Sequence, residues 1–315
     1  MTEAEYRTRI LRLVRAAAPR LERVLQSLYG AILRQAPASE IVAILERHGA
    51  DSRLIVKLLR LERVPQLLSP QGRTRIAVAR EVMELASRHL RAETGTRIPK
   101  DLASSAVRRL TAARLEVLAG EVVDHASRAV KVAVDQLELL GPRETAVQVR
   151  VSVAQSERYA QAVARYRVEL LEADVPAARA RKLAAEYAEN LKRRRLGVMA
   201  RDHAMSSARD TEAATWRDAA ARGHLDPDEW EREWVAILHD GRVCRICYKA
   251  HGTRAPIGGA FPNGSLVAEG HPVGCRCQER LVEKGSKRPK RPAWVEPRYG
   301  SLRPVTPAEA AAGAD

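Results

Sequence analysis

The sequence predicts a mainly α protein: an elongated N-terminal body of several helices, a small α+β module stabilised by a metal ion, and a disordered basic tail. Aromatic residues make up only 4% of the 315 residues, so any core must consist mostly of Ala, Leu and Val. Small and straight-chain residues of this kind favour helix. Apolar residues also recur at intervals of three and four over long stretches, as on the buried face of a helix. All four cysteines fall in one stretch near the C-terminus that is rich in Gly and Pro.

Helices are expected throughout an N-terminal body that spans residues 1–195. The first apolar stripe runs from Leu11 to Ile32 and contains Pro19, which predicts either a kink or a new helix at that point. Gly141 and Pro142 predict the end of the longest helix. The expected helices after the first stripe occupy residues 39–48, 51–63, 73–92, 100–140, 145–173, 176–197 and 198–223.

After Gly223 the pattern changes from helix to a mixed structure, which we assign to a module of residues 196–284. The Asp-Pro-Asp-Glu sequence at residues 226–229 has the spacing of an N-cap, a first-turn proline and a third-position glutamate. It therefore predicts the start of another helix. Residues 234–238 and 278–282 have the composition of strands.

The chain carries a formal net charge of +15, which indicates attraction to a polyanion. Nucleic acid is the usual candidate, although a membrane surface or an acidic protein is equally compatible with charge alone. The basic run at residues 192–195 is either a solvated helix face or part of a phosphate-facing patch. Residues 285–315 combine Lys and Arg with Pro, so we expect a disordered tail that cannot fold alone. The sequence contains no apolar run long enough to predict a membrane span.

The four cysteines have the spacing of a metal site. Cys244 and Cys247 form a Cys-x-x-Cys pair, in which two thiolates lie close enough to share one tetrahedral ion. Cys275 and Cys277 point to the same face if the chain between them is extended. With His271 they offer three candidates for the other two ligand positions. We therefore predict one structural zinc ion per chain, held by Cys244, Cys247 and two of His271, Cys275 and Cys277.

Two other uses of the cysteines remain open at this level. Two disulfides would allow three pairings, but the N-terminal segment lacks the apolar core of a signal peptide, and thiols of unsecreted proteins usually stay reduced. A thiol-disulfide oxidoreductase is disfavoured because the Cys-x-x-Cys pair opens a glycine-rich loop. His251, four residues after Cys247, is a weaker ligand candidate.

The order of these residues resembles the C-terminal domain of the phage Mu F-like head morphogenesis, or minor capsid, proteins. The matching residues, in order, are Asp240, Cys244, Cys247, His251, Gly252, His271, Pro272, Cys275, Arg276 and Cys277. Upstream, Trp234 occupies the family's tryptophan position, and residues 200–203 stand where the family has an Ala-Arg-Thr-Glu-like step on a helix. The resemblance covers residues 195–283. His271 and Cys275 are separated by three residues here, where the family usually has two.

The resemblance implies a non-enzymatic minor component in the interior of the phage head, made in the host cytoplasm. Its expected partners are the portal or the major capsid protein and packaged DNA, contacted through the basic surface and tail, with no membrane partner. The alternatives are a zinc-supported DNA-binding protein and a His-Asn-His-like nuclease. For the nuclease, His251, Asn263 and His271 offer the residue types without the required order. For a DNA-binding zinc finger, too few residues follow Cys277 to form a recognition helix before the tail.

Overall fold

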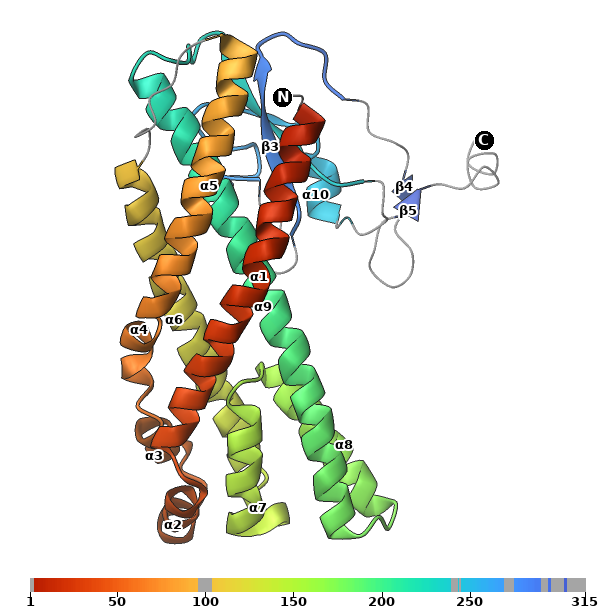
Figure 1. The fold of residues 1–315 in the computed structure, drawn as a ribbon. Helices are drawn as coiled ribbons and strands as arrows, with labels where there is room; N and C mark the ends of the chain where they lie inside the picture. The colour runs from red at the N-terminus through yellow and green to blue at the C-terminus, as the bar shows by residue number, and fades with distance from the viewer. Residues whose placement is uncertain are drawn as a thin grey trace, which may run out of the picture. The chain divides into compact units, whose positions relative to one another are not determined.

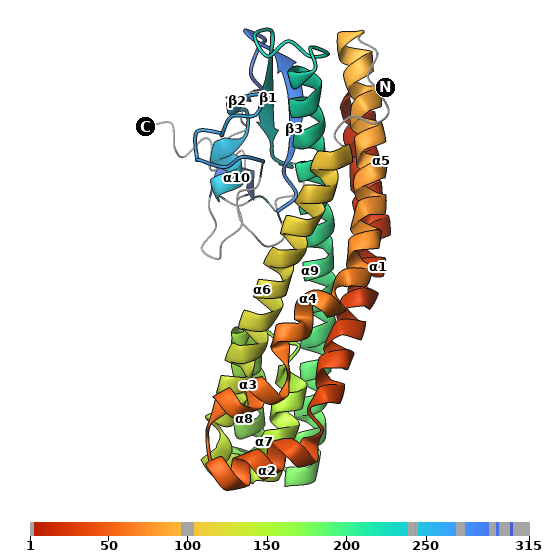
Figure 2. The same cartoon turned by 90° about the vertical axis from the view of Figure 1, so that its left-hand side faces the viewer.

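The structure is a computed structural model that describes residues 3–95, 104–238, 243, 245–268, 275–289, 294–295 and 303–304. It confirms the predicted fold class, because the described chain is mainly helical with a small three-stranded antiparallel sheet and a cysteine cluster near the C-terminus (Figures 1 and 2). The chain packs into two compact units. Unit 1 comprises residues 1–17, 75–110 and 201–315, and unit 2 comprises residues 18–74 and 111–200. The unit that contains the predicted module thus includes segments that the sequence analysis assigned to the helical body.

Ten α-helices and a short 3-10 turn are present in the described residues. They are α1 (Glu3–Gln35), α2 (Ala38–His48), α3 (Ser52–Leu58), the turn Leu61–Arg63, α4 (Val64–Leu67), α5 (Ser69–Thr94), α6 (Ser104–Val134), α7 (Leu137–Ser152), α8 (Glu157–Glu172), α9 (Ala177–Ala221) and α10 (Arg245–Ala250). Gly49 ends α2 with a φ of 62° and a ψ of −141°, backbone angles that glycine adopts far more readily than other residues. Gly141 interrupts α7 with a φ of 71°, so the predicted break at Gly141 and Pro142 is present, although α6 has already ended at Val134.

Several predicted helix boundaries are wrong: the helix expected over residues 51–63 ends at Leu58, and the one expected over residues 100–140 ends at Val134. Of the two alternatives predicted at Pro19, a new helix is not observed, because α1 continues through the exposed proline, where the packing of the buried residues Ala18 and Leu21 outweighs one lost hydrogen bond. Helix α9 continues through Gly197, because the burial of Leu196 and Ala200 on either side outweighs the entropic cost of about 1 kcal/mol for a glycine within a helix. The expected single stretch over residues 145–173 is divided into α7 and α8, the second capped by the Ser156 hydroxyl, which accepts from the backbone N–H of Tyr159.

The sheet of unit 1 has β1 in the centre, between β2 and β3, and both pairings are antiparallel. Its strands are β1 (Trp230–Val235), β2 (Arg254–Pro256) and β3 (Gln278–Glu283), and Trp234 pairs with Glu279 across β1 and β3. The strand predicted at residues 278–282 is therefore confirmed, and the one at 234–238 begins four residues earlier. The helix start predicted at residues 226–229 is wrong. Asp226 instead accepts from the backbone N–H of Asp228 at 2.7 Å in a turn that leads into β1.

The sheet packs against helices of its own unit. One buried cluster contains Leu90 of α5, Trp216 and Ala219 of α9, Leu225, and Leu281 of β3. Figure 2 shows β3 beside the C-terminal part of α9. A second buried cluster includes Trp234 and Phe261, whose rings meet edge to face with centroids 5.2 Å apart. Cys247, Cys275 and Cys277 also belong to this second cluster.

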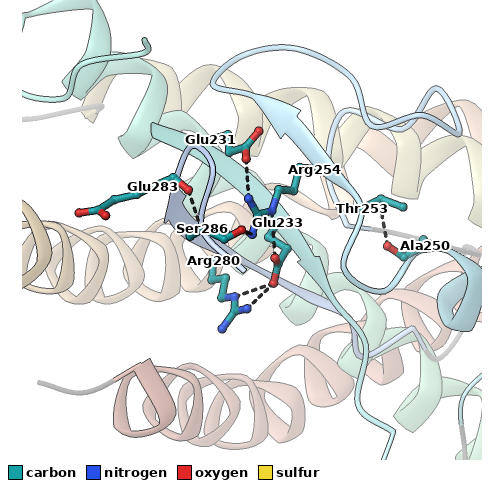
Figure 3. Close-up of polar contacts among 8 residues, drawn as sticks. All are labelled: Glu231, Glu233, Ala250, Thr253, Arg254, Arg280, Glu283 and Ser286. Atoms are coloured by element: carbon teal, nitrogen blue, oxygen red, sulfur yellow. Dashed lines mark hydrogen bonds and ion pairs between the residues drawn. The ribbon is translucent and has the colours of Figure 1, made fainter. Parts of the chain in front are cut away.

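Charged side chains also connect the three strands (Figure 3). Arg254 of β2 pairs with Glu231 at 2.8 Å and with Glu233 at 3.1 Å on β1, and Arg280 of β3 donates to Glu233 at 2.7 Å. Arg254 also donates to the carbonyl of Ser286 at 2.8 Å, just after β3. The network therefore joins all three strands and fixes the first residues that follow the sheet.

Of the predicted tail, the structure describes residues 285–289 and the short strands β4 (Trp294–Val295) and β5 (Arg303–Pro304), which pair antiparallel. The rest of that predicted segment lies outside the described residues. Among the helices that the structure describes, none has the length and apolarity needed to cross a membrane.

Candidate metal centre

Three of the five predicted ligands come together in the structure. Cys247 lies on α10, and Cys275 and Cys277 lie in the segment that leads into β3. All three cysteines are buried and none forms a disulfide, and their sulfur atoms lie within 4.8 Å of one another. Cys244 and His271, the other two predicted ligands, lie outside the described residues.

The central strand β1 brings these cysteines together. After α10, Gly252 turns the chain with a φ of 75° and donates from its backbone N–H to the carbonyl of Trp234 at 2.8 Å. This places α10, and Cys247 with it, beside one end of β1. Strand β3 pairs along the other edge of β1, so Cys275 and Cys277, which precede β3, arrive at the same end. The pairing of three short strands thus brings together cysteines that are about thirty residues apart in sequence.

The spacing of the sulfur atoms suits a tetrahedral ion. Cys247 Sγ and Cys275 Sγ are 3.8 Å apart. A disulfide requires about 2.05 Å. Two sulfurs that each lie about 2.3 Å from a tetrahedral zinc ion are separated by about 3.8 Å. The donor set therefore fits a thiophilic metal ion, with three ligands provided by described residues.

Arg209 of α9 holds the backbone of both C-terminal cysteines. Its buried guanidinium donates from Nε to the carbonyl of Cys277 at 2.9 Å and from Nη2 to the carbonyl of Cys275 at 2.5 Å. A planar fork with two donors is suited to holding two acceptors at a fixed separation. Arg209 thereby fixes the two cysteines relative to α9.

The thiols interact strongly with one another. Hydrogen bonds from Cys247 and Cys277 lower the pKa of Cys275, and the positive charge of Arg209 adds to this effect. The hydrogen bonds of Cys247 with Cys275 and Cys277 raise the pKa of Cys247, and burial raises it further. The surroundings thus favour a thiolate at Cys275. A metal ion would displace the remaining protons, as in thiolate sites generally.

His251, the weaker histidine candidate, has a different role. Its Nδ1 accepts from the backbone N–H of Ala236 at 3.1 Å, which ties the end of α10 to the segment after β1. Among the described groups, it does not belong to the cluster of three thiols. His251 is therefore a buried structural residue of the module.

Sequence reasoning missed Arg209 and its neighbours. The sequence analysis singled out residues 200–203 of this helix, whereas Arg209 is the residue that contacts the backbone of the cysteines. Arg209, Asp210 and Glu212 in this segment are all buried, and Tyr6 of α1 donates a hydrogen bond to Glu212. The available signal was a run of charged residues within an alanine-rich helix, where a solvated face was the simpler interpretation.

Comparisons of the chain with protein-family models, with curated proteins and with solved structures find no match. Within the chain itself, Cys247 meets Cys275 and Cys277 in one buried cluster, which joins the two ends of the motif found in the sequence.

Proposed function

We propose that the chain is a minor capsid, or head morphogenesis, protein of the phage Mu F-like type. In this proposal it is a non-enzymatic component of the head interior that associates with the portal or the major capsid protein and lies near packaged DNA. The support is the ordered motif of Asp, Cys, His and Cys residues, together with the meeting of Cys247, Cys275 and Cys277 in one buried cluster. A net charge of +15 is compatible with this location.

The proposal includes one structural zinc ion per chain. Three thiolates form a soft donor set, which favours zinc over Mg²⁺ or Ca²⁺, since those ions prefer oxygen ligands. Cys244 or His271 would supply the fourth ligand. A closed shell of four protein ligands leaves no position for a catalytic water, which supports a structural role.

The zinc component is tested by elemental analysis of protein purified under reducing conditions. The expected result is one zinc per chain in the native protein and loss of zinc in Cys247→Ser and Cys275→Ser. Comparing Cys244→Ser with His271→Ala identifies the fourth ligand as the one whose replacement weakens zinc retention. Native protein that is folded, free of zinc and titrates with four free thiols would contradict this part of the proposal.

The virion component is tested by mass spectrometry of purified phage particles. We expect the chain in intact particles at a few copies for each portal, protected from added protease until the particles are opened. Detection only on the outer surface, or absence from particles, would sink the proposal. Incubation of the purified protein with duplex DNA and Mg²⁺ or Mn²⁺ distinguishes it from a nuclease, for which cleavage would be seen.

A further inference from the structure

Trp234 of β1 is fully buried beside the cysteines of the candidate metal centre. It belongs to the same buried cluster as Cys247, Cys275 and Cys277. The ring of Phe261 packs edge to face against the indole. The backbone N–H and carbonyl of Trp234 are both hydrogen bonded to the turn that follows α10. The position of the indole is therefore fixed on several sides.

The register of the sheet places Trp234 and Cys277 on the same face. Trp234 pairs with Glu279 across β1 and β3, and Cys277 precedes Glu279 by two residues, so Cys277 lies diagonally across from Trp234. Arg232 and Glu279 have the same diagonal relation, since Arg232 pairs with Leu281. The side chains of Arg232 and Glu279 meet at 2.8 Å. A long side chain on this face of β1 thus reaches its diagonal neighbour.

The indole N–H of Trp234 is buried and has no hydrogen-bond partner among the described residues. It lies close enough to Cys277 to act on that thiol. The hydrogen bond with Cys247 lowers the pKa of Cys277, the hydrogen bond with Cys275 and burial raise it, and the indole N–H of Trp234 lowers it. A buried donor without an acceptor costs free energy, and a neutral thiol is only a weak acceptor.

Metal binding makes this sulfur a better acceptor. Cysteine binds zinc as the thiolate, so each ligand loses its proton and becomes negatively charged. Hydrogen bonds to an ionised acceptor are shorter and about twice as strong as those between neutral groups. Three thiolates together outweigh the positive charge of a zinc ion, and a buried excess of negative charge requires hydrogen-bond donors. Trp234 is such a donor on β1.

We propose that the indole N–H of Trp234 donates a hydrogen bond to the sulfur of Cys277 when that sulfur binds the zinc ion. Trp234 is then a positioning residue that stabilises the metal-bound thiolate. The inference rests on the zinc component of the proposed function and is independent of the role in the phage head.

The test compares Trp234→Phe with Trp216→Phe in the full-length protein. The N–H of Trp216 is also buried without a partner among the described residues, but Trp216 lies in the cluster that contains Leu90, Leu225 and Leu281 and no cysteine. Each variant removes one buried indole N–H and keeps an aromatic ring. Zinc affinity is measured by competition with a chelator. Cobalt is then substituted for zinc, because the thiolate-to-cobalt absorption bands report the energy of the sulfur electrons.

Trp234→Phe is expected to bind zinc about tenfold more weakly than the native chain. Its cobalt bands should shift to longer wavelength, because the sulfur electrons rise in energy when the hydrogen bond is lost. Trp216→Phe should match the native chain in both measurements. Loss of packing alone would weaken binding without moving the bands, so native band positions in Trp234→Phe, or equal shifts in the two variants, would overturn the inference. Native protein that binds neither zinc nor cobalt would contradict the zinc component and this inference with it.

NMR of the native chain gives a second measurement that does not depend on a variant that folds. The indole proton of Trp234 is identified by its proximity to Phe261, the only phenylalanine of the sequence. When an NMR-active cadmium ion replaces zinc, this proton should show coupling to the metal nucleus, which is transmitted through an N–H···S hydrogen bond. Absence of that coupling in cadmium-loaded protein would also overturn the inference.

Discussion

At the scale of single residues, Arg209 is the group on which the geometry of the candidate metal centre depends most. Its hydrogen bonds go to the backbone carbonyls of Cys275 and Cys277, so it orients two of the candidate ligands from a separate helix. Groups that orient metal ligands typically contribute tenfold to hundredfold in affinity. Arg209 is therefore a positioning residue.

Arg209→Met is expected to lower zinc affinity by about 10- to 100-fold, as measured by competition with a chelator of known affinity. Cobalt substitution provides an independent readout, because the thiolate-to-cobalt absorption bands should remain in the variant at saturating metal. Arg201→Met, an exposed site on the same helix, is the control and should leave affinity unchanged. Equal affinities of native protein and Arg209→Met would show that the guanidinium acts only on the fold.

His125 of α6 predicts a pH dependence of stability in unit 2. Burial lowers the pKa of His125 below its ordinary value of 6.5, and the charges of Arg195 and Arg128 lower it further. The unfolded chain therefore takes up a proton at this residue before the folded chain does. The stability due to neutral His125 is complete above about pH 6.5 and is lost as the pH falls towards the lowered value.

The measurement is the urea midpoint at pH 7.5 and at pH 5.5. Native protein should lose more stability between these values than His125→Gln does, while the exposed His48→Gln serves as the control and should behave as native. If the two glutamine variants show the same pH dependence, His125 does not contribute.

The spacing of the cysteines predicted that Cys247, Cys275 and Cys277 would come together, and the structure shows this cluster. The spacing did not predict the residues that position them. Arg209 acts on carbonyl groups more than sixty residues away, and no local pattern encodes such a contact. The role of His251 is likewise visible only in the structure, where its Nδ1 accepts a hydrogen bond from the backbone N–H of Ala236.

At the scale of elements, a single arginine organises the loop between the cysteine pairs. Arg232 of β1 donates to the carbonyls of Pro256 at 3.2 Å, Leu266 at 2.9 Å and Gly259, and pairs with Glu279 of β3 at 2.8 Å. Its guanidinium also lies over the ring of Phe261, 5.0 Å from the centroid. The glycine-rich loop thus has an anchor besides the proposed ion.

Arg232→Met is expected to destabilise unit 1 by about 3–5 kcal/mol, because it leaves the buried carboxylate of Glu279 without its partner. Burial already raises the pKa of Glu279, and the charge of Arg232 opposes this effect. The double variant Arg232→Met with Glu279→Gln should recover part of the loss. Urea unfolding followed by tryptophan fluorescence gives these values, and additive effects of the two changes would contradict direct coupling.

Helices were predicted better than their boundaries. The periodicity of apolar residues identified α2, α5 and most of α9, because it reports the face that packing buries. The new helix considered at Pro19 and the boundary predicted at Gly197 are wrong, because local propensity contributes less to stability than the burial on either side of each residue. The helix start predicted at residues 226–229 is wrong for a different reason, because the same Asp-Pro sequence occurs both at helix N-termini and in turns.

At the scale of the whole molecule, loss of the metal should affect one unit only. Unit 1 contains the cysteine cluster, the strands β1 to β3, α10, the C-terminal part of α9 and the part of α5 that contains Leu90. The spacing of the cysteines alone would limit the effect to the module around them, residues 235–283. The buried contacts of Leu281 with Trp216 and Leu90 predict that it extends further.

Hydrogen exchange with mass spectrometry tests this extent. Treating native protein with a zinc chelator should speed exchange over residues 201–221 and 230–283, and to a lesser degree over residues 75–94. Peptides from residues 18–74 and 111–200 should not change. Cys247→Ser should show the faster exchange without chelator and no further response to it. Faster exchange in both units alike would contradict the prediction.

The buried charged residues of α9 also affect whether this helix has a single packing arrangement. The part of α9 in unit 1 packs largely through alanines, such as Ala204, Ala208 and Ala219. With such small side chains alone, the helix could shift or rotate slightly at little cost in free energy. Arg209 and Glu212 remove that freedom, because only one placement gives the guanidinium its two carbonyls and the carboxylate its tyrosine hydroxyl. Apolar replacements of matching volume at both positions would then leave a helix with several packings of similar energy, visible as broadened NMR signals from Trp216.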